Sequence, residues 1–287
     1  MKPIPAKVRE RLISGIKKFS KILEDAKARD INESDTVVIV TDMLSYLFGY
    51  EKYSEITSEF TVRGTYCDLA TRIDGKLQYL IEVKAIGNEL KENFIKQAID
   101  YAANEGVDWV ILTNGLKWIV FKVTFSKPID KEKVIDIDFN QTDYKNEDHL
   151  ETLFCLSKEG CGKSVLEDFH IQQQVLSKHF IGNVILTEPI LIAIKKELKK
   201  LAPDVKTDID QISKVIIQEV LKREIFEGEK AEEVTKKISR LMKKQKRVKV
   251  KEQKQPIVKT DIVKKDTIEV IKNKWESDQL PVIKFIF

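Results

Sequence analysis

Apolar residues recur at helical spacing near the start of the chain. Between residues 6 and 29 they follow one another at intervals of three and four, which predicts a helix. They are Val8, Leu12, Ile13, Ile16, Phe19, Ile22 and Leu23. After a polar break at 30–35, a second helix is expected to run to about Leu47. Glu33 lies four residues before Val37 and therefore on the same face, one turn before the buried stripe.

The middle of the chain carries short apolar and alternating runs that predict strands. These runs are 56–62, 66–73, 77–84, 108–113 and 117–123. An Asp74-Gly75 pair joins the second run to the third, and such a pair is a strong hairpin signal. The segment 88–103 predicts a helix, so the chain must cross over the sheet before the fourth strand. We therefore expect at least one parallel pair of strands.

Beyond Pro128 the pattern loosens, and the later part of the chain reads as mainly helical. Pro189 suits the first turn of a helix, and Asp208 with Gln211 forms a capping box. The expected helices are 164–180, 189–201, 208–225 and 229–242. The predicted division has five parts: an N-terminal helix (1–30), an α/β domain (31–128), a connector (129–150), a helical region (151–243) and a basic, partly disordered tail (244–287). Within the connector, one short extended piece is expected at 134–139.

Composition narrows the class of protein. A hydrophobic fraction of 42% over 287 residues suffices for a packed core, and no apolar run is long enough to cross a bilayer. The cysteines have no paired spacing, which favours reduced thiols in a cytoplasmic protein, and the histidines lack a partnering Cys-x-x-Cys, so no zinc site is expected. These residues are Cys67, Cys155 and Cys161, and His149, His170 and His179.

The formal net charge of +4 is mild, but the basic residues are unevenly distributed. Ten of them crowd one stretch: Lys236, Lys237, Arg240, Lys243, Lys244, Lys246, Arg247, Lys249, Lys251 and Lys254. Such a run could bind a phosphate backbone by releasing counterions. It could equally be a solvated tail that keeps the protein soluble, and the sequence leaves both interpretations open. The apolar stretch 280–287 that ends the chain reads as a short strand or a docking segment.

Charged residues on the predicted hairpin indicate a chemical site. Side chains alternate along a strand, so Glu82 and Lys84 point to the same face, and Asp68 lies on the neighbouring strand. Two carboxylates suit a hard cation such as Mg²⁺, and a lysine beside them can steady a water or a developing negative charge. The run 79–81 is too apolar for an edge strand, so charges on it would be awkward without a purpose. The set is typical of a metal-dependent phosphodiesterase.

The helix that follows the hairpin adds two polar positions. Gln97 interrupts its apolar stripe, and Tyr101 lies one turn later on the same face. In this order, Asp68, Glu82-x-Lys84 and Gln97-x-x-x-Tyr101 resemble the PD-(D/E)XK nuclease superfamily. The flanking residues 57–70, 74–76, 80–84 and 113–118 are similar to the N-terminal nuclease domain of the R subunit of type I restriction enzymes.

The resemblance covers about residues 30–125 and implies a fold class. The expected fold is α/β, with a restriction-endonuclease-like core. Its mixed five-stranded sheet would be flanked by helices in the order α-β-β-β-α-β-β. An α-helical C-terminal region would follow.

The resemblance also implies site residues and a cofactor. Asp68, Glu82 and the backbone carbonyl of Val83 would ligate Mg²⁺, with Mn²⁺ as a substitute. Lys84 would orient or help activate the attacking water and stabilise charge on the phosphate. Gln97 would order the site or the DNA backbone. A further acid would come from the first helix of the domain, at Glu33, although helix N-termini favour acids for electrostatic reasons alone.

The chain departs from that family in one respect. Type I R subunits continue into helicase motor domains with a phosphate-binding loop, and here only the segment 160–164 (Gly-Cys-Gly-Lys-Ser) hints at one. The full pattern needs glycine at position 157, where the chain has Ser157. We therefore expect no ATP binding and interpret the segment as a loop capped by Ser164 at the start of a helix.

Three functions remain open from sequence. The first is a magnesium-dependent DNA endonuclease. The second is a catalytically silent nuclease-like module that binds DNA or a partner subunit of a restriction or defence system. The third is an internal salt-bridge cluster in an unrelated α/β protein, and this is the least favoured because burying such charges without a ligand is costly. The expected partners are DNA and restriction-system subunits, with a homodimer as a further option and no membrane.

Overall fold

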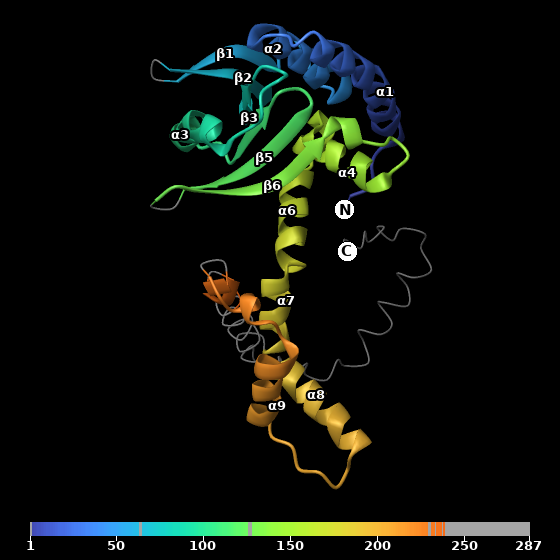
Figure 1. The fold of residues 1–287 in the computed structure, drawn as a ribbon, viewed down its shortest axis with the longest axis vertical. Helices are drawn as coiled ribbons and strands as arrows, with labels where there is room; N and C mark the ends of the chain where they lie inside the picture. Colours follow the sequence, from blue (N-terminus) through green and yellow to red (C-terminus); the bar gives the residue numbers. More distant parts are fainter. Residues whose placement is uncertain are drawn as a thin grey trace, which may run out of the picture. The chain divides into compact units, whose positions relative to one another are not determined.

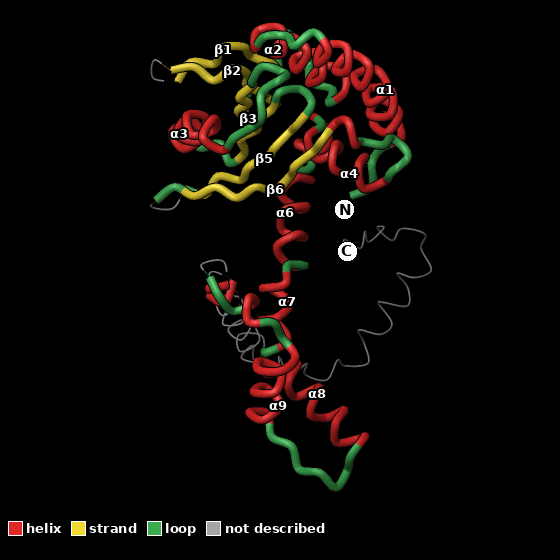
Figure 2. The backbone as a smooth tube through the Cα atoms, viewed as in Figure 1, coloured by secondary structure: helices red, strands yellow, loops and turns green. Residues whose placement is uncertain are grey.

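The computed structural model describes residues 2–62, 65–125, 128–228, 231–232, 234–236 and 238. The chain divides into two compact units, Met1–Ser177 and Lys178–Phe287. Figures 1 and 2 trace the elements of each. These units differ from the segments that the sequence suggested, because the N-terminal helix and the residues after 128 pack with the sheet. The basic stretch after Lys236 and the apolar stretch 280–287 lie outside the described residues.

A six-stranded mixed sheet forms the centre of the first unit, in the order β1-β2-β3-β4-β5-β6. The strands are β1 (Ile56–Val62), β2 (Thr65–Ile73), β3 (Lys76–Val83), β4 (Trp109–Thr113), β5 (Lys117–Thr124) and β6 (Asp130–Asp138). Strands β3 and β4 are parallel, as the intervening helix requires, and the other neighbours are antiparallel. The predicted hairpin is confirmed: Asp74 and Gly75 have φ of 50° and 75°, and positive φ at both central residues is typical of a type I′ turn.

The expectation of five strands is wrong, because β6 occupies the stretch interpreted as a connector. It pairs with β5 along its whole length, from Asp130 opposite Thr124 to Asp138 opposite Lys117. The first half of β6 is charged and at least partly exposed, and the buried apolar residues Val134, Ile135 and Ile137 all lie in its second half. Edge strands carry charges that discourage further pairing, which masks their hydrophobic period in sequence.

Helices cover both faces of the sheet (Figure 1). In chain order they are α1 (Ala6–Ala28), α2 (Glu33–Asp42) with its π-helical continuation η1 (Met43–Leu47), the 3₁₀ turn η2 (Glu92–Ile95), α3 (Lys96–Glu105), the 3₁₀ turn η3 (Phe139–Gln141), α4 (Glu147–Leu156), α5 (Lys158–Gly162) and α6 (Val165–Val175). One buried cluster joins α1, η1 and α4 to Ile81 and Trp118 of the sheet. The other joins α3 to Leu80 and Phe121. Opposite faces of the same strands therefore serve two cores.

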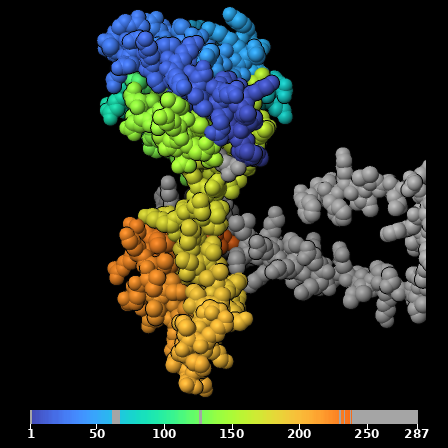
Figure 3. Space-filling model, turned by 90° about the vertical axis from the view of Figure 1, so that its right-hand side faces the viewer, coloured from blue at the N-terminus to red at the C-terminus, as the bar shows by residue number. Residues whose placement is uncertain are grey.

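The N-terminal helix is an integral part of this unit. Its residues Leu12, Phe19 and Leu23 are buried in the first cluster. In Figure 3 the blue N-terminal residues lie against green residues that follow β5, and α1 contacts both η3 and α4. The apolar stripe predicted from sequence is thus confirmed, and it binds the helix to the sheet layer.

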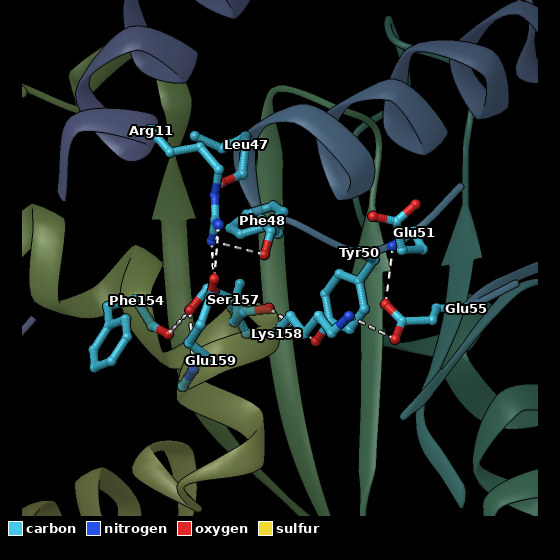
Figure 4. A network of polar contacts seen from close by, with 12 residues as sticks. Arg11, Leu47, Phe48, Tyr50, Glu51, Glu55, Phe154, Ser157, Lys158 and Glu159 are labelled. Atoms are coloured by element: carbon cyan, nitrogen blue, oxygen red, sulfur yellow. Dashed lines mark hydrogen bonds and ion pairs between the residues drawn. The ribbon is translucent and has the colours of Figure 1, made fainter. Parts of the chain in front are cut away.

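A polar network ties α1 to the start of α5, just before the segment 160–164 that hinted at a phosphate-binding loop (Figure 4). The Arg11 guanidinium donates to both carboxylate oxygens of Glu159, at 2.8 and 2.6 Å. It also donates to the backbone carbonyls of Leu47 and Phe48, at 3.2 and 3.3 Å. Lys158 pairs with Glu55 at 2.7 Å. These contacts fasten α5 to α1, η1 and the residues just before β1.

The segment 160–164 is helical at its start, and this corrects its interpretation as a loop. Gly160 lies in α5, where an added Cβ would stand 2.0 Å from the carbonyl oxygen of Phe154, so its small size serves close packing. Ser157 caps α5 by accepting from the Gly160 N–H at 3.1 Å. Ser164 precedes α6 with φ of 55° and makes no side-chain cap hydrogen bond, so its predicted capping role is wrong.

The second unit is helical where it is described. Its elements are α7 (Lys178–Ile185), α8 (Glu188–Leu201), α9 (Ile209–Val215), the π-helical η4 (Ile216–Val220) and the 3₁₀ turn η5 (Arg223–Ile225). Pro189 stands in the first turn of α8, and Asp208 with Gln211 forms the expected capping box before α9. One buried cluster in this unit joins Leu191, Ile212 and Ile216 with partly buried neighbours.

Among the described residues, no helix combines the length and the apolar character that crossing a bilayer requires. Cys67, Cys155 and Cys161 are free thiols, as their spacing suggested.

Candidate functional site

Asp68, Glu82 and Lys84 converge at one end of the β2–β3 pair. Lys84 Nζ lies 2.8 Å from Glu82 Oε1 and 4.0 Å from Asp68 Oδ2. Asp68 and Glu82 are the neighbours in sequence of Leu69 and Ile81, which lie opposite each other on β2 and β3. The Asp68 carboxylate accepts a hydrogen bond from the backbone N–H of Val83 at 2.7 Å. The structure therefore brings together the three head groups that the sequence placed on neighbouring strands.

The fold places this cluster at the carboxyl end of the parallel pair. Strand β3 is central, between β2 and β4, and Leu80 and Ile81 are fully buried, which agrees with its apolar sequence. Lys84 follows the last residue of β3, and its backbone N–H donates to the carbonyl of Thr113 at the end of β4, at 2.8 Å. Ligands of α/β sheets commonly bind where parallel strands end, since the following loops diverge there.

A third carboxylate reaches the cluster from helix α2. Glu33 is the first residue of this helix, directly after the N-cap Asn32, whose side chain accepts the Asp35 N–H at 2.9 Å. Its Oε1 lies 3.4 Å from Lys84 Nζ. Glu33 is the most exposed of the three acids, at 47%, against 29% for Asp68 and 12% for Glu82. It therefore stands at the rim of the cluster.

Helix α3 approaches the same lysine, although not in the way the sequence indicated. Tyr101 is buried, as expected, but Gln97 is exposed and so does not interrupt a buried stripe. The Gln97 side-chain amide donates to Tyr101 Oη one turn along the helix. The approach to the site is made by Phe94, in the turn before α3, whose ring centre lies 6.0 Å from Lys84 Nζ. Sequence reasoning missed Phe94, because an aromatic residue there reads simply as core.

The charges of the cluster do not balance. Three carboxylates surround one ammonium, an excess of two negative charges. Burial raises the pKa of Asp68, and burial together with the neighbouring acids raises the pKa of Glu82. Burial alone would lower the pKa of Lys84, but the hydrogen bond to Glu82 and the charges of all three acids outweigh it and raise that pKa. Lys84 is thus an ammonium at neutral pH, and its single positive charge is too little to neutralise the three carboxylates.

Comparison with known families identifies this region. Residues 34–137 match the family model of the type I restriction enzyme R protein N terminus. The match runs from α2 through β6 and includes Asp68, Glu82, Lys84 and Gln97, with Glu33 just outside it. It covers about a third of the chain and confirms the resemblance drawn from sequence. Neither the comparison with curated proteins nor that with solved structures gave a match.

The acids of the cluster can be compared with the ligands that a metal ion needs. Within the described residues, no group of three or more His, Cys, Asp or Glu side chains is arranged to hold an ion. Glu33 contacts the cluster through Lys84, and its ligation of a metal stays a prediction. Mg²⁺ is usually held by one or two carboxylates and keeps several waters, and Asp68 with Glu82 supplies such a pair. The excess negative charge also fits a divalent cation. Ligation by the Val83 carbonyl stays a prediction.

Proposed function

We propose that the first unit is a magnesium-dependent DNA endonuclease related to the N terminus of type I restriction R proteins. The observation that carries this proposal is the pair of half-buried carboxylates, Asp68 and Glu82, on adjacent strands with a single ammonium between them. A buried pair of like charges is unfavourable by itself, so the arrangement favours a bound cation. The family match supplies the substrate class, since restriction enzymes act on DNA.

Each residue then has a defined task. Asp68 and Glu82 hold Mg²⁺, or Mn²⁺ in its place, and the ion when bound supplies Lewis-acid stabilisation of phosphodiester cleavage. The hydrogen bond from the Val83 N–H fixes the orientation of the Asp68 carboxylate. Lys84 carries its proton at neutral pH, so it orients water and stabilises negative charge on the phosphate and does not act as a general base. Gln97 remains a candidate for ordering the DNA backbone.

The test is cleavage of supercoiled plasmid DNA with titrated Mg²⁺ and, separately, Mn²⁺. Lys84→Met and Asp68→Asn should abolish nicking. Lys122 provides a matched control on β5: its side chain is as exposed as that of Lys84, 15%, and it pairs with Glu167 at 2.6 Å and Asp108 at 3.0 Å. Lys122→Met removes an equivalent ion-paired lysine outside the cluster and should leave cleavage within about twofold of wild type, as expected away from the site.

A different result would favour the silent module. If DNA stays intact with either metal, and if binding weakens steeply with salt yet is unaffected by Lys84→Met, the region recognises DNA without cutting it. Both functions leave three predictions in place: partner subunits of a restriction system, a second copy of the chain and a cytoplasmic location.

A further inference from the structure

The turn between β4 and β5 reaches across to the loop that follows Lys84. Asn114, in this turn, is buried, and its side-chain amide donates to the backbone carbonyls of Ile86 and Asn88, at 3.2 and 2.9 Å. Its carbonyl oxygen accepts the backbone N–H of Lys117 at 2.8 Å. One side chain therefore joins two loops that are far apart in sequence.

The turn itself is held independently of the loop. Thr113 Oγ1 donates to the Lys117 carbonyl at 2.7 Å and accepts the Gly115 N–H at 3.0 Å. Trp118 Nε1 donates to the Gly115 carbonyl at 3.0 Å. Gly115 has φ of 83°, and an added Cβ would stand 3.0 Å from the Leu23 side chain, so α1 also packs against the turn. These contacts make a rigid base from which Asn114 extends.

The loop on the other side leads away from Lys84 toward α3. Its backbone is bonded within itself from the Asn88 N–H to the Ala85 carbonyl, at 2.9 Å. At Gly87 it lies against Asp30, where an added Cβ would stand 2.3 Å from Oδ1. The loop is thus held by the hydrogen bonds from Asn114 on one side, and the end of the Asp30 side chain lies next to it on the other. Its course decides where Lys84 and Phe94, which flank it, can lie.

We propose that Asn114 is a positioning residue for the reaction at Lys84, an inference that rests on the proposed nuclease function. By fixing the carbonyls of Ile86 and Asn88, Asn114 holds the main chain that leaves the site and keeps Lys84 Nζ among its three acids. An asparagine side chain suits this task because it offers two N–H donors to one loop and an oxygen acceptor to the other. Misplacement of a catalytic group by about 1 Å can cost on the order of 100-fold in rate.

Two substitutions in the same turn separate positioning from simple support of the fold. Asn114→Asp keeps the acceptor for the Lys117 N–H and removes both donors to the loop. Thr113→Val is the matched control, since it removes the hydroxyl bonds inside the turn and leaves the Asn114 bonds to the loop in place. For each variant, kcat and KM for plasmid cleavage, Tm and hydrogen exchange of the amides of residues 84–91 are measured on the full chain.

Asn114→Asp should lower kcat by about 10- to 100-fold with KM for DNA within about twofold, and it should speed exchange in residues 84–91. Thr113→Val, with a fall in Tm similar to that of Asn114→Asp, should keep kcat within about twofold of wild type and leave the hydrogen exchange of residues 84–91 unchanged. If both variants lose kcat in proportion to their loss of Tm, or if exchange in the loop is unaltered in Asn114→Asp, the proposal is overturned.

Two further arms keep the test decisive. If Asn114→Asp does not fold, Asn114→Ser takes its place: it also removes the amide that donates to the carbonyls of Ile86 and Asn88, and it should lower kcat with KM unchanged. Unchanged kcat in Asn114→Ser overturns the proposal. If wild type cleaves no DNA, the proposed function fails, and exchange alone decides whether Asn114 holds the loop: a rise confined to Asn114→Asp supports it, and identical exchange in both variants overturns it.

Discussion

The excess negative charge around Lys84 predicts opposite responses to removing the ammonium and to removing an acid. Lys84→Met leaves Asp68, Glu82 and Glu33 without their shared counter-ion, so the free protein should be less stable, and added Mg²⁺ should restore part of the loss. Glu82→Gln removes a carboxylate whose ionisation the fold opposes, as its raised pKa indicates. This variant should be no less stable than wild type in EDTA and should lose the response to Mg²⁺.

The expected magnitudes follow from the contacts. Lys84 donates a charge-assisted hydrogen bond of 2.8 Å to Glu82, and losing such a bond costs about 2 kcal/mol. For a unit of this size that lowers Tm by roughly 4–8 °C. Binding of Mg²⁺ at about ten times its Kd stabilises the folded state by about 1.4 kcal/mol, or roughly 3–6 °C. The shift in Lys84→Met should appear at an equal or lower Mg²⁺ concentration than in wild type, because the ammonium no longer repels the ion.

The assay is thermal unfolding followed by tryptophan fluorescence, which reports on the first unit through Trp109 and Trp118. Wild type, Lys84→Met, Glu82→Gln and the control Lys122→Met are compared in EDTA and across a Mg²⁺ titration. Lys122→Met should lose stability and yet keep the wild-type shift with Mg²⁺. A Mg²⁺ shift that is equal in wild type and Glu82→Gln would refute the reasoning, because the ion would then bind elsewhere.

Three other outcomes are expected. The pKa values of Asp68 and Glu82 are raised, so as pH falls these carboxylates take up protons at a higher pH than free carboxyls do. The loss of kcat/KM toward acid pH should therefore have its midpoint above pH 4.5, the ordinary pKa of glutamate. A midpoint at or below pH 4.5 would contradict the raised pKa values. Arg11→Met breaks the paired bonds to Glu159 and should lower Tm by roughly 4–8 °C, about 2 kcal/mol, whereas an unchanged Tm would show that the network adds nothing. Gly75→Ala, with φ of 75° and open space around it, should cost about 1 kcal/mol from backbone strain alone, measured by denaturant unfolding, and a variant as stable as wild type excludes that strain.

Local signals predicted much of the first unit. The period of Leu12, Phe19 and their neighbours gave α1, and the Asp74-Gly75 pair set the register of the hairpin that holds Asp68 and Glu82. These features are local, because a helix stripe and a two-residue turn depend on residues close in sequence. For β6 the sequence predicted only an extended piece at 134–139 within a connector, because its pairing with β5, and not its own composition, makes the whole of 130–138 a strand of the sheet.

The candidate site shows the same contrast between its members. Glu82 lies on β3 and Lys84 directly follows the strand, so the alternation of side chains along an extended chain places them together from sequence. Gln97 was predicted on the buried face of α3, but it is exposed. Whether a helix position is buried depends on how the helix is rotated about its axis against the sheet, and the spacing of apolar residues does not fix that rotation to within one residue. The approach of Phe94 to Lys84 and the bonds of Asn114 to the loop depend on where separate segments meet.

The chain by itself determined the type of its elements and the chemistry of its acids and lysine, because both are written in short-range patterns and residue identity. Tertiary structure alone decided that Glu33, 51 residues before Lys84, comes within 3.4 Å of its amino group, and that three acids share one counter-ion. The physical reason is that electrostatic energy depends on distances through space. Those distances are set by the packing of α1, α2 and α3 against the sheet.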